Sequence, residues 1–364
     1  MIPVYEPFLG NEELALVTKA VKSSWISSQG IFIEDFSKML GEYISPDGQV
    51  SLCSNGTVAL HLALIAAGVG TGDKVIVPDF TYVASINAIL YVGATPVVVD
   101  VDQRTWVMDI QNISDACLSQ AKAILLVDIY GYPSLSRADS NYLKKYDLAI
   151  IQDCAESLGS FLDKKHTGSH ADFATFSFFG NKTITTGEGG AVWSRDIDSA
   201  EFIDKIKSQG IKKGTRYEHD ELGYNYRMTN IQAAIGCAQL AKIDEILKRK
   251  RQLQDLYRAT LEKYGAIFQQ LPKSSSSSYW IIGALFPSTD VNDLSDYLKQ
   301  KNIDTRPFFS PVSSFKHVEY LNLNAFPNSK FLASYGLIFP SAPSLIDTGE
   351  VDTVLSALDE YFTS

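Results

Sequence analysis

A single lysine, Lys182, lies between two stretches that read as β-strands, in segment 173–192 with the sequence FATFSFFGNKTITTGEGGAV. A lysine held in a tight turn between two strands can be partly withdrawn from water, which lowers the pKa of its amine. The neutral amine is the form that attacks a carbonyl carbon to make a Schiff base. A lysine on an ordinary surface loop fits the same pattern, so the interpretation depends on the residues that accompany Lys182.

Polar and aromatic residues follow several other predicted strands. Residues 54–57, SNGT, follow the strand pattern 50–53 and open a helix, whose free N–H groups and threonine hydroxyl favour a phosphate. Segment 79–82 (DFTY) follows the strand pattern 74–78, and an aromatic ring there can lie against a planar ligand. Asp153 ends the apolar run 148–152, where a buried carboxylate needs a cationic partner. The ordinary alternatives are an Asn-Gly turn for 54–57 and core packing for the aromatic residues of 79–82.

These residue types together match one cofactor, pyridoxal 5′-phosphate (PLP). PLP needs a lysine for its aldehyde, a carboxylate that keeps the ring nitrogen protonated, an aromatic ring against its face, and donors for its phosphate. The chain offers them in order, each near a predicted strand end, as Gly56 and Thr57, an aromatic residue of 79–82, Asp153, Ser177 and Lys182. We therefore predict a PLP site with Lys182 and Asp153 as its catalytic residues.

The elements that must position these residues form a repeated pattern of strands and helices. Helical patterns at 11–22 and 31–43 come first; apolar strands at 50–53, 74–78, 95–100, 123–128 and 148–155 then alternate with helical patterns at 57–67 and near Tyr82, Asp109 and Arg137. Such alternation predicts an α/β fold with a mostly parallel sheet covered by helices on both faces. Ligands bind at the carboxyl ends of the strands in such sheets.

The second half of the chain changes character. Segment 201–227 is charged and contains glycine, which is typical of a loop or lid, and a long helical pattern covers 229–263 with Thr229 as its N-cap. The serine run 274–278 predicts a flexible surface loop, and the remainder resembles a small α+β domain. We predict a large domain over residues 1–239 and a small C-terminal domain over 240–364.

Composition excludes several classes of protein. The 364 residues carry a formal charge of −10, which gives no basic field for nucleic acid or an anionic membrane. The four cysteines and five histidines show no metal-ligand spacing, so we expect reduced thiols and no metal. The N-terminus has no signal-peptide pattern and no apolar run reaches 18 residues, so we expect a cytoplasmic protein without membrane partners.

The chain also resembles a known family, the DegT/StrS-type sugar aminotransferases, which are fold-type I PLP enzymes. The resemblance covers nearly the whole sequence and is carried by the motifs SNGTVALHLAL, VPDFTYVASINAI, GATPVVVDVD, IQDCAES, FSFFGNKTITTGEGG and LGYNYRMTNIQAAIGCAQL. It implies that Lys182 binds the cofactor, that Asp153 meets its ring nitrogen, and that Tyr82 stacks on the ring. It further implies a phosphate cup of Gly56, Thr57 and Ser177, and Glu156 near the 3-hydroxyl group.

The resemblance has further implications for assembly. The family completes its phosphate site with an asparagine from a neighbouring subunit, and Asn225 in GYNYRM matches that position. It therefore implies a homodimer with shared active sites.

The same resemblance narrows the reaction. Family members that act as dehydratases carry histidine where this chain has Lys182, so transamination from L-glutamate is favoured. The motifs are most similar to enzymes that aminate C4 of a nucleotide-linked 4-keto-6-deoxyhexose, in bacteria for O-antigen synthesis. Members that use GDP sugars usually read Tyr-Trp-His-Asp where this chain has segment 217–220 (YEHD), and they usually carry histidine at the position of Ser313. A dTDP sugar, amination at C3, dehydration and a non-catalytic sensor remain alternatives.

Overall fold

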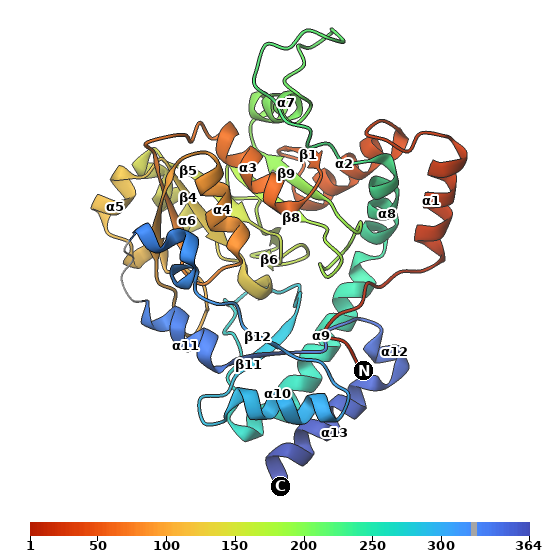
Figure 1. Ribbon diagram of the computed structural model, residues 1–364, viewed down its shortest axis with the longest axis vertical. Helices are drawn as coiled ribbons and strands as arrows, with labels where there is room; N and C mark the ends of the chain where they lie inside the picture. Colours follow the sequence, from red (N-terminus) through yellow and green to blue (C-terminus); the bar gives the residue numbers. More distant parts are fainter. Residues whose placement is uncertain (322–325) are drawn as a thin grey trace.

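A seven-stranded sheet forms the centre of the protein, as a computed structural model of residues 1–321 and 326–364 shows (Figure 1). The strand order is β1-β9-β8-β5-β4-β2-β3. All neighbours are parallel except β9, which runs antiparallel to both β1 and β8. The strands are β1 (Gln49–Cys53), β2 (Lys74–Pro78), β3 (Thr95–Val99), β4 (Ala123–Val127), β5 (Ala149–Asp153), β8 (Phe173–Ser177) and β9 (Gly190–Ser194). The predicted α/β fold with a mostly parallel sheet is confirmed.

Helices cover both faces of this sheet because its inner strands are apolar on both sides. Val75, Val77 and Leu125 belong to a core that faces α3 (Gly56–Ala66) and α4 (Val83–Tyr91). The intervening residues Ile76 and Ile124 belong to the core on the opposite face. The other helices of the large sheet are α1 (Asn11–Lys22), α2 (Ile31–Ile44), α5 (Asp115–Gln120), α6 (Arg137–Leu143), α7 (Ile197–Ile206) and α8 (Asn230–Ala241).

A smaller body at the other end of the molecule packs around an antiparallel sheet. Its strands β11 (Ile282–Leu285), β13 (Gly336–Phe339) and β12 (Arg306–Pro307) are ordered β11-β13-β12. Its helices are α9 (Ile243–Leu261), α10 (Val291–Gln300), α11 (Pro327–Tyr335), α12 (Leu345–Thr348) and α13 (Glu350–Thr363). Helix α9 reaches from the large body into the small one, since Ile246 packs below the large sheet and Leu253 in the small core (Figure 1). The predicted domain division at residue 240 stays a prediction.

Three local predictions were wrong. The helical pattern 229–263 is two helices, because Lys242 leaves helical geometry between α8 and α9, although Thr229 caps α8 as predicted. The helix predicted near Asp109 is a 3-10 turn, Ile110–Asn112, followed by the short α5. The segment predicted as a loop from residue 201 belongs to α7 as far as Ile206, and a long loop without helix or strand extends beyond this helix (Figure 1).

The serine run is also not a flexible surface loop. Ser275–Ser276 form strand β10, which pairs with β6 (Phe161–Leu162); β6 also pairs with β7 (Lys165–His166). Ser278 is fully buried; its hydroxyl donates to the carbonyl of Glu156 (2.8 Å) and its N–H donates to the hydroxyl of Ser160 (2.8 Å). Hydroxyl groups that bond to backbone satisfy their own polarity, so a serine-rich segment can cross the interior.

Among the described residues, no helix is long and apolar enough to span a membrane.

Candidate active site

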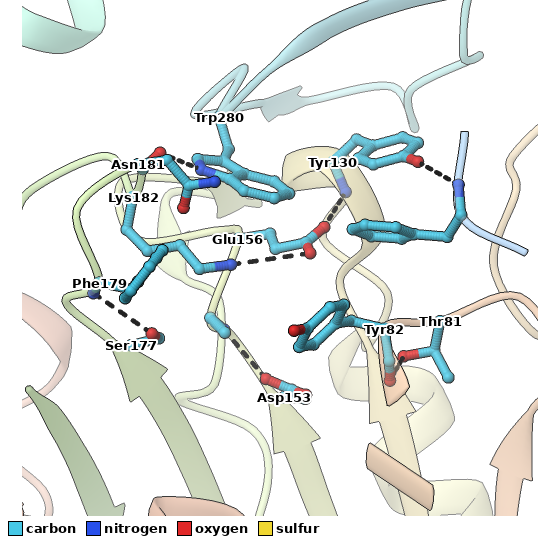
Figure 2. Close-up of polar contacts among 12 residues, drawn as sticks. Thr81, Tyr82, Tyr130, Asp153, Glu156, Ser177, Phe179, Asn181, Lys182 and Trp280 are labelled. Atoms are coloured by element: carbon cyan, nitrogen blue, oxygen red, sulfur yellow. Dashed lines mark hydrogen bonds and ion pairs between the residues drawn. The ribbon is translucent and has the colours of Figure 1, made fainter. Parts of the chain in front are cut away.

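A cavity of about 470 Å³ opens at the carboxyl ends of the parallel strands β4, β5 and β8. Seven of the eight residues predicted for the cofactor site line it: Gly56, Thr57, Tyr82, Asp153, Glu156, Ser177 and Lys182. Figure 2 shows Lys182, Glu156, Asp153 and Tyr82 facing this common space. The rule that ligands of parallel sheets bind at strand ends thus located the cavity.

Lys182 lies in the turn that follows β8. Its N–H donates to the carbonyl of Phe179 (3.0 Å), and its own carbonyl accepts from the hydroxyl of Tyr5 (2.7 Å). Its Nζ is 3.8 Å from Oε1 of Glu156 and 3.8 Å from the centre of the Trp280 ring. Burial lowers the pKa of Lys182, and the negative charges of Glu156 and Asp153 oppose that shift.

Asp153 is the last residue of β5, and the sheet buries its carboxylate. Oδ2 accepts from the hydroxyl of Ser85 (3.1 Å), and Oδ1 accepts from the N–H of Ala155 (3.1 Å). Burial raises the pKa of Asp153, while the N–H of Ala155 and the charge of Lys182 oppose that shift. A cation beside this carboxylate would favour its charged form.

Glu156 stands between Lys182 and the backbone of Tyr130 (Figure 2). The N–H of Tyr130 donates to Oε2 of Glu156 (2.8 Å), from a residue with a positive φ of 54°. A left-handed conformation is unfavourable for tyrosine, and here it directs an N–H group at the carboxylate. Burial raises the pKa of Glu156 to about 7, against the opposing charge of Lys182.

The first turn of α3 meets the end of β8 at the side of the cavity. Asn55 caps this helix by accepting from the N–H of Val58 (2.9 Å). The N–H groups of Gly56 and Thr57 belong to the same turn, where no helical carbonyl accepts them. A Cβ atom on Gly56 would lie 2.7 Å from Cβ of Ser177, so only glycine allows this close approach. Free N–H groups, the Ser177 hydroxyl and the helix dipole together favour an anion.

Tyr82 precedes α4 and is half exposed, with 56% of its surface accessible. Its ring centre lies 5.6 Å from that of Phe309, which lines the same cavity. An exposed aromatic ring at the mouth of a cavity offers an apolar face to a planar ligand.

Several lining residues were not predicted from the sequence. Asn181, Trp280 and Phe309 line the cavity, and Ser85 reaches Asp153 from within α4. Asn181 could have been identified from the sequence, because it directly precedes Lys182. Trp280 and Phe309 come from distant segments that only the tertiary fold brings here.

Asn225 is not part of this cavity. It is exposed, and its backbone pairs with that of Ser208 in an isolated bridge. Its predicted role toward a neighbouring subunit stays a prediction.

The residues of the cavity fit PLP. A buried carboxylate, an amine of lowered pKa, an aromatic ring and a cup of donors border one space. The buried Oδ1 of Asn181 also has no hydrogen-bond partner within the described part of the chain, as expected at the edge of a ligand site. Lys182 could hold the aldehyde, Asp153 the ring nitrogen, and Gly56, Thr57 and Ser177 the phosphate.

Comparison with known proteins agrees with this chemistry. Residues 7–359 match the model of the DegT/DnrJ/EryC1/StrS aminotransferase family. The chain is 40% identical over 363 residues to a GDP-perosamine synthase of Escherichia coli O157:H7, covering all of this chain and 99% of that protein. It is 38% identical over 369 residues to a GDP-perosamine synthase of Vibrio cholerae, with the same coverage of both chains.

A solved structure shows the same fold. The PLP form of Spr1654 from Streptococcus pneumoniae superposes with a TM-score of 0.89 and 25% identity, over 100% of this chain and 98% of that one. The family match extends across both bodies of the molecule and includes the turn that carries Lys182. The chain is therefore a PLP-dependent sugar aminotransferase that belongs to the DegT/DnrJ/EryC1/StrS aminotransferase family.

Proposed function

We propose that the protein transfers the amino group of L-glutamate to C4 of GDP-4-keto-6-deoxymannose and so forms GDP-perosamine. The observation that carries the proposal is the full-length identity of 38–40% to two GDP-perosamine synthases. The presence of Lys182, with Asp153 and Glu156 around it, supports transamination over the dehydration and sensor alternatives.

The proposed mechanism assigns the proton transfers to Lys182. When bound, PLP supplies the aldehyde that accepts the amino group and a ring that holds the electrons of the broken C–H bond. The Nζ of Lys182, whose pKa burial lowers, takes the proton from the α-carbon of glutamate. The same Nζ later delivers a proton to C4 of the sugar.

The other side chains of the cavity would hold the cofactor and orient the amine of Lys182. Asp153 would keep the ring nitrogen protonated, because a charge-assisted contact is strong in a site closed to water. Glu156 lies close enough to Lys182, at 3.8 Å, to keep its amine over the reacting atoms. Tyr82 would cover one face of the ring, and the first turn of α3 would bind the phosphate.

The proposed working form is a cytoplasmic homodimer. Asn225 is exposed on the loop 207–229, outside the cavity of its own chain, which suits a contact with the phosphate in a neighbouring subunit. By family resemblance, the product would serve surface polysaccharide and O-antigen synthesis.

The choice of nucleotide is the point most open to test. Segment 217–220 lies on the exposed loop, where Tyr217 is 89% accessible. Ser313 follows the cavity residue Phe309 by four positions, and its N–H donates to Asp79 (2.8 Å). The purified protein is incubated with L-glutamate, PLP and either GDP- or dTDP-4-keto-6-deoxyhexose, and products are followed by mass spectrometry.

The outcomes separate the candidates. Replacement of the ketone by an amine on the GDP sugar supports the proposal, and Lys182→Ala is expected to abolish it. Conversion of the dTDP sugar alone would instead indicate a dTDP-4-amino-4,6-dideoxyglucose (viosamine) pathway. Loss of water without amination, or full activity of Lys182→Ala, would overturn the assignment.

A further inference from the structure

A second lysine, Lys250 in α9, is completely buried at the junction of the large and small bodies. Its Nζ donates to the carbonyls of Trp280 (2.8 Å) and Ser341 (3.1 Å) and lies 4.7 Å from the centre of the Tyr5 ring. Its partners are thus two neutral carbonyls and a ring face. Burial lowers its pKa to about 7. Burying an amine without a carboxylate is unfavourable, which suggests that the contacts of Lys250 have a structural or functional role.

Both aromatic residues that Lys250 contacts also contact the Lys182 turn. Trp280 donates its Nε1–H to the carbonyl of Asn181 (2.5 Å), and its ring covers Nζ of Lys182, as Figure 2 shows. Tyr5 donates its hydroxyl to the carbonyl of Lys182 (2.7 Å). Two consecutive carbonyls of the turn are therefore held by side chains from the N-terminal segment and from the segment before β11.

These contacts connect Lys250 to the Asn181–Lys182 turn by two routes. One arm runs from Lys250 through Trp280 to Asn181, and the other runs from Lys250 through Tyr5 to Lys182. The hydrogen bonds within the turn, such as that from the N–H of Lys182 to the carbonyl of Phe179, hold its main chain but do not reach the side chain of Lys182. External contacts must do so.

We propose that Lys250 is a positioning residue that holds Trp280 and Tyr5 against the Asn181–Lys182 turn and so keeps the amine of Lys182 covered from water. This inference rests on the proposed role of Lys182 in proton transfer. It assigns no contact with substrate or cofactor to Lys250 itself. The alternative is that Lys250 only joins α9 to the backbone near Ser341.

The test uses the full-length protein freed of cofactor and the variant Lys250→Met, which keeps the length of the side chain and removes its donors. Acetic anhydride labels neutral amines, and mass spectrometry of the peptide containing Lys182 gives the extent of labelling at each pH. The labelling midpoint is the pH at which half of Lys182 is labelled. We expect this midpoint to move to higher pH in Lys250→Met, because water that reaches the amine reduces the effect of burial and so raises its pKa. The charges facing Lys182, those of Glu156 and Asp153, are unchanged in this variant.

Tyr257→Phe is the matched control. Tyr257 lies on the same helix, is fully buried, and donates to the carbonyl of Pro340 (2.9 Å), next to Ser341. Its loss removes a buried hydrogen bond from α9 without touching Trp280 or Tyr5. We expect its labelling curve to match that of the unmodified protein.

Two further variants test the arms separately. Trp280→Phe and Tyr5→Phe keep an aromatic ring and remove the hydrogen bonds to the carbonyls of Asn181 and Lys182. Each should shift the labelling midpoint in the same direction as Lys250→Met. In the loaded enzyme, the rate of the glutamate half-reaction should fall about tenfold with Lys250→Met, as expected for one charge-assisted contact.

A labelling curve of Lys250→Met that coincides with that of the unmodified protein would refute the inference. If Lys250→Met does not fold, unchanged curves for both Trp280→Phe and Tyr5→Phe refute it equally. An equal shift in Tyr257→Phe would also count against it, since general loosening of α9 would then explain the result. The labelling needs no substrate, so failure here differs from an active Lys182→Ala, which would instead remove the proposed function.

Discussion

Replacing Gly56 by alanine is the sharpest test of the phosphate cup. A Cβ atom at this position would lie 2.7 Å from Cβ and 3.0 Å from Oγ of Ser177, both closer than non-bonded atoms normally approach. The backbone of α3 or the end of β8 must therefore shift. Overpacking of this kind typically costs about 1–3 kcal/mol.

The shift falls on the groups proposed to bind the phosphate. The N–H groups of Gly56 and Thr57 and the hydroxyl of Ser177 would separate or turn as the clash is relieved. If the full strain energy weakens cofactor binding, the Kd for PLP rises by roughly five- to 150-fold. If it appears in folding, the free energy of unfolding of the apoprotein falls by the same amount. Absorbance titration with PLP and urea denaturation of the apoprotein measure the two effects separately.

Two further variants isolate the cause. Gly70→Ala is the control for the loss of glycine flexibility, because a Cβ atom there meets nothing within 4 Å. Ser177→Gly removes the two clashing atoms and leaves Cα of residue 177 at 3.4 Å, an ordinary contact. Gly56→Ala should therefore destabilise the Ser177→Gly protein less than it destabilises the original protein. Unchanged PLP binding and stability in Gly56→Ala would refute the close approach of α3 and β8.

Three further predictions address the charges and the fold. Asp153→Asn should reduce the glutamate half-reaction at least about 100-fold, measured by stopped-flow absorbance, because the neutral amide does not stabilise a protonated ring nitrogen; a near-normal rate would contradict the role of Asp153. Because burial raises the pKa of Glu156 from 4.5 to about 7, its contribution to stability is present below about pH 4.5 and is lost as the pH rises through 7. Over that window the apoprotein should lose about 3 kcal/mol that Glu156→Gln does not lose in urea denaturation, and parallel pH curves would argue against the shift. Thr229→Ala removes the capping box with Gln232 and should lower the free energy of unfolding by about 1 kcal/mol with an unchanged urea slope.

The sequence predicted the large sheet and much of the site because both follow local rules. Alternating apolar strands and helices specify a parallel sheet, and the residues that follow those strands must meet at one edge. Helix α1 has the predicted bounds, Asn11–Lys22, since its apolar spacing and flanking residues agree. Lys182 and Asp153 lie 29 positions apart in the sequence and border the same cavity.

What the sequence did not predict depends on contacts between distant segments. Lys242 interrupts a helical pattern without proline or glycine, so no local signal marks the break between α8 and α9. The serine run appeared polar, yet Ser278 is buried because its hydroxyl bonds to the backbone of Glu156, 122 positions away. Trp280, 99 positions from its partner Asn181, looks like an ordinary core residue in the sequence. Such roles become visible only when the partner is known.

The charges of the cavity explain why these distant contacts matter. Two carboxylates, Asp153 and Glu156, share one lysine, and only Glu156 lies within ion-pair distance of its amine among the described residues. Burial raises the pKa of both carboxyl groups, and the charge of Lys182 only partly opposes this, so a further cation beside them would be favourable. A ligand with a cationic ring nitrogen beside Asp153 would restore the balance, which is the property that suits the site to PLP. The amine of Lys182 must then stay near Glu156, and Trp280 and Tyr5, both in contact with Lys250, are the side chains placed to keep it there.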